Sequence, residues 1–331
     1  MKKTLRIILM TLMMLVSASA FAASKKSIVC TTYPEYDWVL NVLGSRASAF
    51  NVALLQNKGT DLHSYQPSVQ DIAKISVSDL FVYVGGESDE WVEDVLQNAR
   101  NKNMIVINMM KVLGDAVREE EIVEGMQESE EHEHEHGHDH HEGEAHDHEH
   151  EEAEYDEHVW LSLRNAAVIT QALSEAVQKL DSKNAATYKA NAEAYIEKLG
   201  KLDAEFQAAV AKAETKTLVF ADRFPFRYLA DDYGLKYYAA FAGCSAESEA
   251  SFETVIFLAK KIDELALKSV LTIEKSDKKI AKTVVSNTKA KNQQILEMDS
   301  LQSVTQKDIK GGKNYLDAMK QNLAVLKAAL N

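Results

Sequence analysis

Cysteine, proline and long apolar runs are scarce in this chain of 331 residues, which has 2 cysteines and 3 prolines. Two cysteines exclude a disulfide-rich scaffold, and they leave a single Cys30–Cys244 bridge open as an alternative to two buried thiols. No segment after residue 22 is apolar for long enough to span a membrane. Glycine-rich phosphate-binding loops are absent as well, so the sequence gives no sign of an ATPase.

Lysine and arginine are missing from residues 119–157, a stretch that holds nineteen of the 51 acidic residues. The formal charge of −14 therefore belongs to this segment, and the rest of the chain, with 37 basic and 32 acidic residues, is slightly basic. A slightly basic body gives no reason to expect nucleic-acid binding. Residues 128–152 also lack aromatic and β-branched side chains, so we predict that 119–157 is a disordered insertion.

The same insertion concentrates imidazole groups. It contains nine of the eleven histidines, all within nineteen residues: His132, His134, His136, His138, His140, His141, His146, His148 and His150. Neutral imidazoles are good nitrogen donors, and interleaved carboxylates add oxygen donors and negative potential. We interpret the segment as an auxiliary metal-binding loop of modest affinity, because a flexible chain must be ordered before it can chelate.

The N-terminus has the three parts of a secretory signal. Lys2, Lys3 and Arg6 precede an apolar stretch over residues 7–16, and small residues end at Ala22. This pattern predicts a signal peptide over residues 1–22 that is cleaved after Ala22. The mature protein is then expected in the periplasm or another extracytoplasmic compartment.

Short apolar runs alternate with helical-period stretches in two parts of the chain. The runs are SIVCTT, FNVALL, LFVYVG and MIVINM in the first part, and TLVFA, LKYYAA, SVLTI and QILEM in the second. Apolar strands separated by helices are typical of parallel sheets. We predict two α/β lobes, the first over residues 23–118 and completed by 158–181, and the second over 214–331.

One long helix is expected between the lobes, over residues 182–213. This stretch has no proline, and its apolar residues recur at spacings of three and four: Tyr188, Ala192, Tyr195, Leu199, Leu202, Phe206 and Val210. Such a spacing indicates one buried face. At 1.5 Å per residue the helix would extend about 48 Å, long enough to join the lobes rigidly.

Two histidines lie outside the insertion, where a fold can hold them in place. His63 occurs in DLHSYQPSVQD, directly after a predicted strand, and His158 occurs in DEHVWLSL, where the insertion ends. The carboxyl ends of strands line the ligand crevice of α/β lobes. Each histidine alone would more often be a surface or capping residue, but together they are candidate metal ligands.

These two motifs and the C-terminal half resemble the metal-binding substrate proteins of ABC importers, the cluster A-I type that supplies zinc or manganese to a permease. The resemblance implies that His63 and His158 bind the metal. The second motif, Asp-Pro-His-x-Trp-Leu in the family, matches Asp156 to Leu161 with Glu157 in place of proline. Zinc members of the family carry a histidine-rich insertion before this motif.

The chain departs from the family at the third ligand. A His or Glu is expected eleven residues before Gly234, and Arg223 stands there. Arginine has no lone pair for a metal, and a shifted register offers Asp222 instead. The fourth family position falls on Asp299. We therefore predict a site of His63, His158 and Asp299, with Glu274 as an additional ligand or as the salt-bridge partner of Arg223.

The resemblance implies a monomeric, non-enzymatic binding protein that captures divalent metal and delivers it to a membrane permease with a separate ATPase subunit. The imidazole-rich loop and two site histidines favour zinc, while Asp299 and the missing third histidine leave manganese open. Three other hypotheses stay open: a hydrolytic zinc enzyme, a metal store that acts through its histidine-rich loop, and attachment to host surfaces. The enzyme is disfavoured because the folded body has no paired-histidine zinc motif or Gly-x-Ser-x-Gly motif.

Overall fold

The computed structural model describes residues 25–127, 154–245 and 249–331. The predicted signal peptide and the nine loop histidines lie outside the described residues. Among the helices of the described segments, none is long and apolar enough to cross a membrane.

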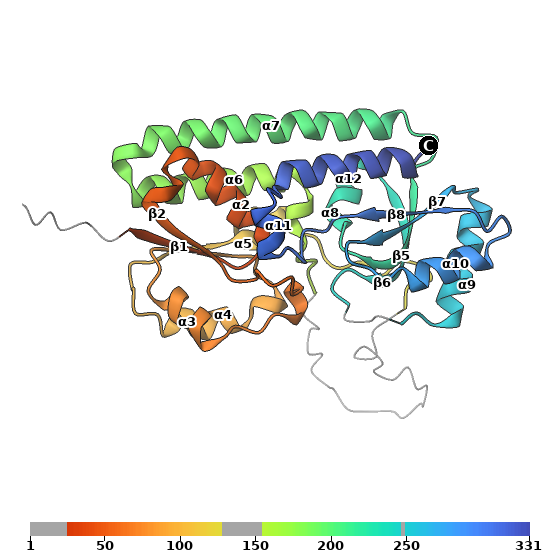
Figure 1. Cartoon of the computed structure of the whole chain (residues 1–331), viewed down its shortest axis with the longest axis horizontal. Helices are drawn as coiled ribbons and strands as arrows, with labels where there is room; N and C mark the ends of the chain where they lie inside the picture. The colour runs from red at the N-terminus through yellow and green to blue at the C-terminus, as the bar shows by residue number, and fades with distance from the viewer. Residues whose placement is uncertain (1–24, 128–153, 246–248) are drawn as a thin grey trace, which may run out of the picture.

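Each of two lobes is built on a parallel sheet of four strands (Figure 1). The first sheet has the order β2-β1-β3-β4. Its strands are β1 (Lys26–Cys30), β2 (Phe50–Leu54), β3 (Leu80–Tyr83) and β4 (Ile105–Asn108). The second sheet has the order β6-β5-β7-β8. Its strands are β5 (Thr217–Phe224), β6 (Lys236–Ala242), β7 (Ser269–Ile273) and β8 (Gln294–Met298). All eight apolar runs form strands, and the prediction of two α/β lobes is confirmed.

Helices cover both faces of each sheet, as parallel sheets require. The helices of the first lobe are α2 (Tyr33–Leu43), α3 (Val69–Ser76), α4 (Trp91–Gln97), α5 (Met109–Leu113) and α6 (Leu163–Leu180). Those of the second are α8 (Arg227–Tyr233), α9 (Phe252–Glu264), α10 (Lys279–Asn287) and α12 (Tyr315–Ala329), whereas the short α11 (Gln306–Lys310) begins against the first lobe, where the Gln306 N–H donates to the Asn57 carbonyl at 2.9 Å. A satellite core lies under α3 and α4 in the first lobe, and another lies under α9 and α10 in the second.

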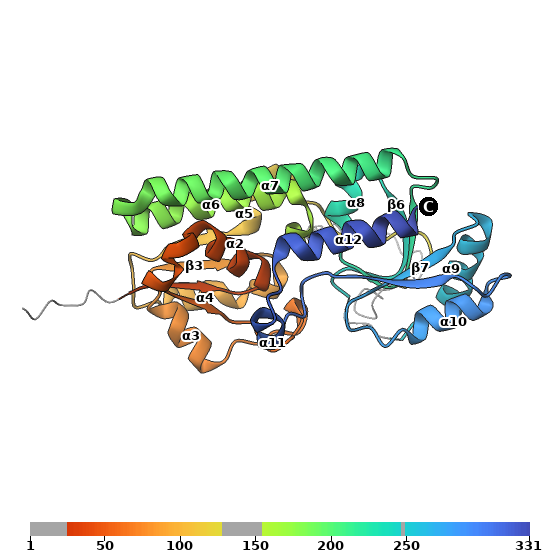
Figure 2. The same cartoon turned by 45° about the horizontal axis from the view of Figure 1, so that its top comes forward.

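The long helix α7 (Ala185–Ala211) runs beside both lobes (Figures 1 and 2). All seven apolar positions that the sequence spacing picked out are buried along it. They belong to one core that also includes residues of α6, α12 and both sheets. Because this core is continuous through the molecule, α7 holds the two lobes at a fixed spacing rather than tethering them.

Helix α2 begins with a capping box in which Thr32 and Glu35 bond reciprocally. The Glu35 carboxylate accepts from the Thr32 N–H at 2.5 Å and from the Thr31 hydroxyl at 2.9 Å. Burial raises the pKa of Glu35 to about 7 despite these bonds. The start of α2 therefore carries a carboxyl group whose ionisation the fold opposes.

The predicted disordered insertion has structured flanks, so the prediction of disorder is wrong for residues 119–127 and 154–157. Glu119 and Tyr155 form an antiparallel bridge, and Gln127 pairs with Phe241 of β6. Asp156 and Glu157 are buried. Composition alone missed this, because these acids have specific hydrogen-bond partners, which offset the cost of burying them.

Candidate metal site

His63 is positioned by a short turn after β2. It lies in the 3-10 helix η2 (Leu62–Ser64), and Asp61 caps that helix by accepting from the His63 N–H at 3.1 Å. Leu62 is buried and anchors the turn. The imidazole of His63 is thereby placed at the carboxyl end of the first sheet, as the sequence predicts.

His158 is fully buried, where the insertion rejoins the fold. The Asp156 carboxylate accepts from the His158 N–H at 2.8 Å and lies 2.9 Å from its Nδ1. Trp160 follows, with its ring 5.4 Å from that of His158. The Trp160 indole donates to the Ser300 carbonyl at 2.8 Å, and the Tyr315 hydroxyl donates to the Trp160 carbonyl. These bonds fix the segment against the second lobe.

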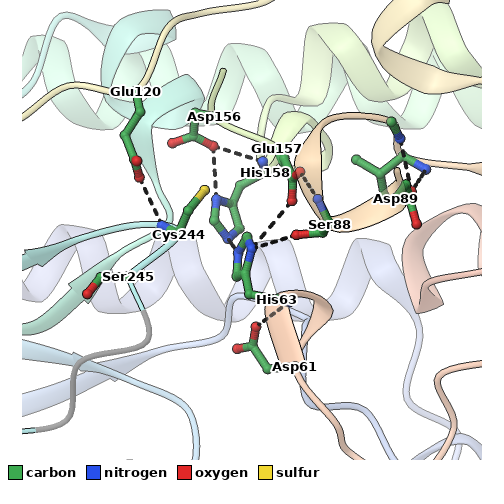
Figure 3. A network of polar contacts seen from close by, with 12 residues as sticks. Asp61, His63, Ser88, Asp89, Glu120, Asp156, Glu157, His158, Cys244 and Ser245 are labelled. Carbon is green, nitrogen blue, oxygen red and sulfur yellow. Dashed lines mark hydrogen bonds and ion pairs between the residues drawn. The ribbon is translucent and has the colours of Figure 1, made fainter. Parts of the chain in front are cut away.

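The two imidazoles face one another (Figure 3). Their Nε2 atoms are 3.2 Å apart, although the residues are 95 positions apart in sequence. Two nitrogens bound to one tetrahedral zinc are separated by about 3.3 Å, given Zn–N bonds of about 2.0–2.1 Å. The histidine pair therefore already has the spacing of two nitrogen ligands of one tetrahedral zinc ion.

Each histidine also has a carboxylate near its Nδ1. Asp156 lies beside His158, and Glu157 approaches the Nδ1 of His63 at 3.4 Å, where the Ser88 hydroxyl lies at 2.9 Å. The other Glu157 oxygen accepts from the Ser88 N–H at 2.7 Å. A carboxylate on the far nitrogen orients a ligating imidazole and raises its basicity. The residue that replaces the family's proline thus supports His63.

Gly86 makes room for the Glu157 carboxylate. A Cβ atom at this position would lie 2.4 Å from a Glu157 oxygen, and the backbone has φ of +83°. Only glycine adopts this conformation readily and leaves the space free. The approach of Glu157 to the first lobe therefore depends on this residue.

The two imidazoles differ in proton affinity. Burial, together with the neighbouring His158, lowers the pKa of His63 well below its usual range. Burial also acts to lower the pKa of His158, but the Asp156 carboxylate outweighs it and the net pKa is raised. In the metal-free form, His158 therefore holds a proton more tightly than His63.

A cleft of about 390 Å³ lies beside His63. It is lined by residues of both lobes, among them Asp61, Arg223 and Glu274. Arg223 donates to the Asp61 carboxylate at 2.8 Å. Burial acts to raise the pKa of Asp61, but the guanidinium holds it below the usual value. The positive charge beside the histidines is thus neutralised by an acid of the first lobe.

Known proteins are similar to this chain in both fold and sequence. Residues 28–329 match the family of the zinc-uptake complex component A, periplasmic (ZnuA). The chain belongs to the ZnuA family.

Its relatives include the high-affinity zinc uptake system protein ZnuA of Bacillus subtilis, 31% identical over 92% of this chain and 88% of that protein. The zinc-binding lipoprotein AdcA of Streptococcus pneumoniae is 32% identical over 92% of this chain, which spans 56% of AdcA. The solved Zn(II)-bound ZnuA-like domain of that AdcA is 28% identical, with a TM-score of 0.69 over 93% of this chain and 99% of the domain. The resemblance drawn from the two histidine motifs is confirmed, as is the expectation of a binding protein rather than an enzyme.

Asp299, the fourth position predicted from the ZnuA family, has other partners in the structure. Its carboxylate pairs with Lys313 and accepts from the Leu301 N–H at 2.9 Å. Its backbone N–H and carbonyl both bond to the Asn322 side chain at 2.8 Å. Asp299 is not in the cluster formed by the two histidines within the described residues. Its role as a ligand stays a prediction.

Glu274 and Asp222 line the cleft but have local partners. Glu274 accepts from the Ser300 N–H and hydroxyl at 2.7 and 2.8 Å. Asp222 accepts from the Arg223 N–H at 3.0 Å. The prediction that Glu274 neutralises Arg223 is corrected, because Asp61 takes that place. Whether Glu274 or Asp222 contacts a metal stays a prediction.

Sequence analysis missed Cys244 as part of this site. One ligand atom of each of His63, His158 and Cys244 lies within 4.8 Å of the other two. Neither Cys30 nor Cys244 forms a disulfide, and Cys30 is buried in β1. Burial raises the pKa of the Cys244 thiol well above its usual value, with Asp156 adding to the effect. The signal in the sequence is Arg223 at the third family position, because an arginine there indicates that another residue supplies the third ligand.

Proposed function

We propose that the chain captures zinc outside the cytoplasm and delivers it to the membrane permease of an ABC importer, whose ATPase subunit supplies the energy. One observation carries the proposal: the Nε2 atoms of His63 and His158 lie 3.2 Å apart, with a carboxylate near each Nδ1. This is a preorganised pair of nitrogen ligands in a protein of the ZnuA family. Zinc is the transported cargo rather than a resident cofactor.

The metal identity follows from the donor atoms. Imidazole suits zinc, whereas manganese favours sites rich in carboxylate, carbonyl and water oxygens. Asp299, which left manganese open in the sequence, is paired with Lys313 instead. Zinc is therefore the proposed substrate, and manganese is the alternative that separate titrations test.

Capture is proposed to begin at the histidine-rich segment. Its nine imidazoles collect scarce metal and pass it by ligand exchange to the cleft, where fixed ligands hold it more tightly. The predicted signal peptide would export the chain, which then acts as a monomer. Attachment to host surfaces stays a separate hypothesis, and no contact among the described residues supports it.

Calorimetric titration of zinc and, separately, manganese tests the proposal. The protein should be metal-stripped and should lack residues 1–22 and 128–152, so that the cleft alone is measured. One tight zinc equivalent is expected, weak manganese binding is expected, and the zinc equivalent should vanish in His63→Ala and in His158→Ala. Tight binding that survives both substitutions would refute the cleft site.

A further inference from the structure

Arg223 leaves the histidine pair one protein ligand short. Structural zinc sites have four protein ligands and catalytic ones have three, and arginine cannot supply one. The Arg223 guanidinium binds Asp61 and also donates to the Ser245 carbonyl at 3.3 Å. It thus links the turn that carries His63 to the loop that follows β6. Arg223 cannot bind the metal, but its two hydrogen bonds hold the segments on both sides of the site together.

The loop after β6 brings Cys244 to the histidines. A Cβ atom at Gly243 would lie 3.2 Å from Cε1 of His158 and 2.9 Å from the Phe224 carbonyl, so the chain passes directly against the imidazole. The Cys244 N–H donates to the Glu120 carboxylate at 3.0 Å. The loop is therefore held on both sides of its cysteine, and Figure 3 shows the sulfur beside the two imidazoles.

The distances suit a zinc ion. With a Zn–S bond of about 2.3 Å and a Zn–N bond of about 2.0–2.1 Å, a tetrahedral site separates sulfur from nitrogen by about 3.6 Å. The ligand atoms of His63, His158 and Cys244 lie within 4.8 Å of one another. Closing that difference requires a movement of at most about 1 Å, which rotation of the cysteine side chain supplies.

We propose that Cys244 is the third protein ligand beside His63 and His158, so that this chain binds zinc with two imidazoles and one thiolate. This inference rests on the proposed function and specifies its ligand set. On binding, the thiol proton is released to solvent and a Zn–S bond forms. A thiolate makes the site softer, which favours zinc and cadmium and disfavours manganese.

Cobalt(II) titration of the metal-free full chain tests the proposal. A cysteine thiolate bound to cobalt gives a near-ultraviolet charge-transfer band that imidazole ligands do not give. The chain has only two cysteines, and residues 128–152 contain none, so the histidine-rich segment cannot produce this band. The band should appear in the wild type and in Cys30→Ser, and it should be lost in Cys244→Ser.

Zinc affinity, measured by competition with a chelator, gives the second readout. Cys244→Ser should weaken binding by at least about 100-fold, because a direct ligand matters at least as much as the outer-shell partners, which are worth about 10–100-fold. Cys244→His should restore binding to within about tenfold of the wild type without restoring the band. Far-ultraviolet circular dichroism checks that each variant is folded.

The outcomes separate the two proposals. If His63→Ala abolishes tight zinc binding while the wild type shows no charge-transfer band and Cys244→Ser binds normally, the cysteine assignment is overturned and the proposed function stands. If the histidine substitutions leave tight binding unchanged, the cleft is not the zinc site and both proposals fail. A band that depends on Cys30 rather than Cys244 would also overturn the assignment.

Discussion

Glu157 should control zinc affinity although it is not placed to bind the ion. Its carboxylate lies 3.4 Å from the Nδ1 of His63, and its side chain is 3% exposed. Glu157→Gln removes the charge but keeps an oxygen that can accept from the Ser88 N–H. The substitution therefore tests the charge with little disturbance of the backbone.

The magnitude follows from distance and burial. A zinc ion on the Nε2 of His63 would lie about 7 Å from this carboxylate, where a divalent ion and a unit charge attract by about 5 kcal/mol at an effective dielectric constant of about 20. Part of that attraction is offset, because burial raises the pKa of Glu157 to about 7 and the group must first ionise. We expect a net loss of about 10–100-fold in zinc affinity, or about 1.4–2.7 kcal/mol.

Isothermal titration in two buffers of different ionisation enthalpy provides the assay. At pH 7, zinc binding should release fewer protons in Glu157→Gln than in the wild type. In the wild type the bound zinc ion favours ionisation of Glu157, which releases a proton, and glutamine has no such proton to release. Ser88→Ala, which keeps the carboxylate, is the matched control and should lose less affinity. Equal affinity and equal proton release in Glu157→Gln and wild type would refute the role of the carboxylate.

Four further outcomes are expected. Arg223→Ala should keep zinc affinity within about tenfold by competition titration, since the side chain cannot ligate; a larger loss would mean that it is essential to the site. Deleting residues 128–152 should leave one tight zinc equivalent by metal analysis, whereas a metal store would lose nearly all. Zinc retention in dialysis should fall between pH 7.5 and 5, because protons compete with the metal for His158, whose pKa the Asp156 carboxylate raises despite burial; a flat profile would contradict this ligand. Glu35→Gln should gain stability relative to the wild type as the pH rises from 5 to 8, measured by urea unfolding. Burial raises the pKa of Glu35 in the folded state to about 7, so its contribution to stability is present below the pKa of the unfolded state and is lost as the pH rises through 7. The free energy of unfolding of the wild type should fall by up to about 3 kcal/mol from this loss. A constant difference would show that Glu35 does not titrate there.

Local sequence patterns predicted the framework well. The apolar runs SVLTI and QILEM coincide with β7 and β8, and the spacing in residues 182–213 found the buried face of α7. These features depend on periodicity and on burial of a continuous apolar surface, both of which a single sequence records. The flanks of the insertion were missed because the burial of Asp156 and Glu157 depends on partners far away in the chain.

The site was only partly predictable for the same reason. His63 and His158 stood out because so few histidines lie outside the insertion, and family motifs placed both. Cys244 had no motif of its own, and its closeness to the histidines results from the path of the loop after β6 past His158. Likewise, nothing local indicates that Arg223 pairs with Asp61, which is 162 positions away. Such contacts are properties of the tertiary fold.

The packing of Trp160 against His158 gives this protein an intrinsic optical reporter. The indole is fully buried and is held to the Ser300 carbonyl, so its emission should be insensitive to bulk solvent. The imidazole ring of His158 lies 5.4 Å from the indole ring, close enough to quench its fluorescence, and a metal ion bound to that imidazole alters the quenching. Loading of the cleft could thus be followed in real time from native fluorescence, with Trp160→Phe as the blank.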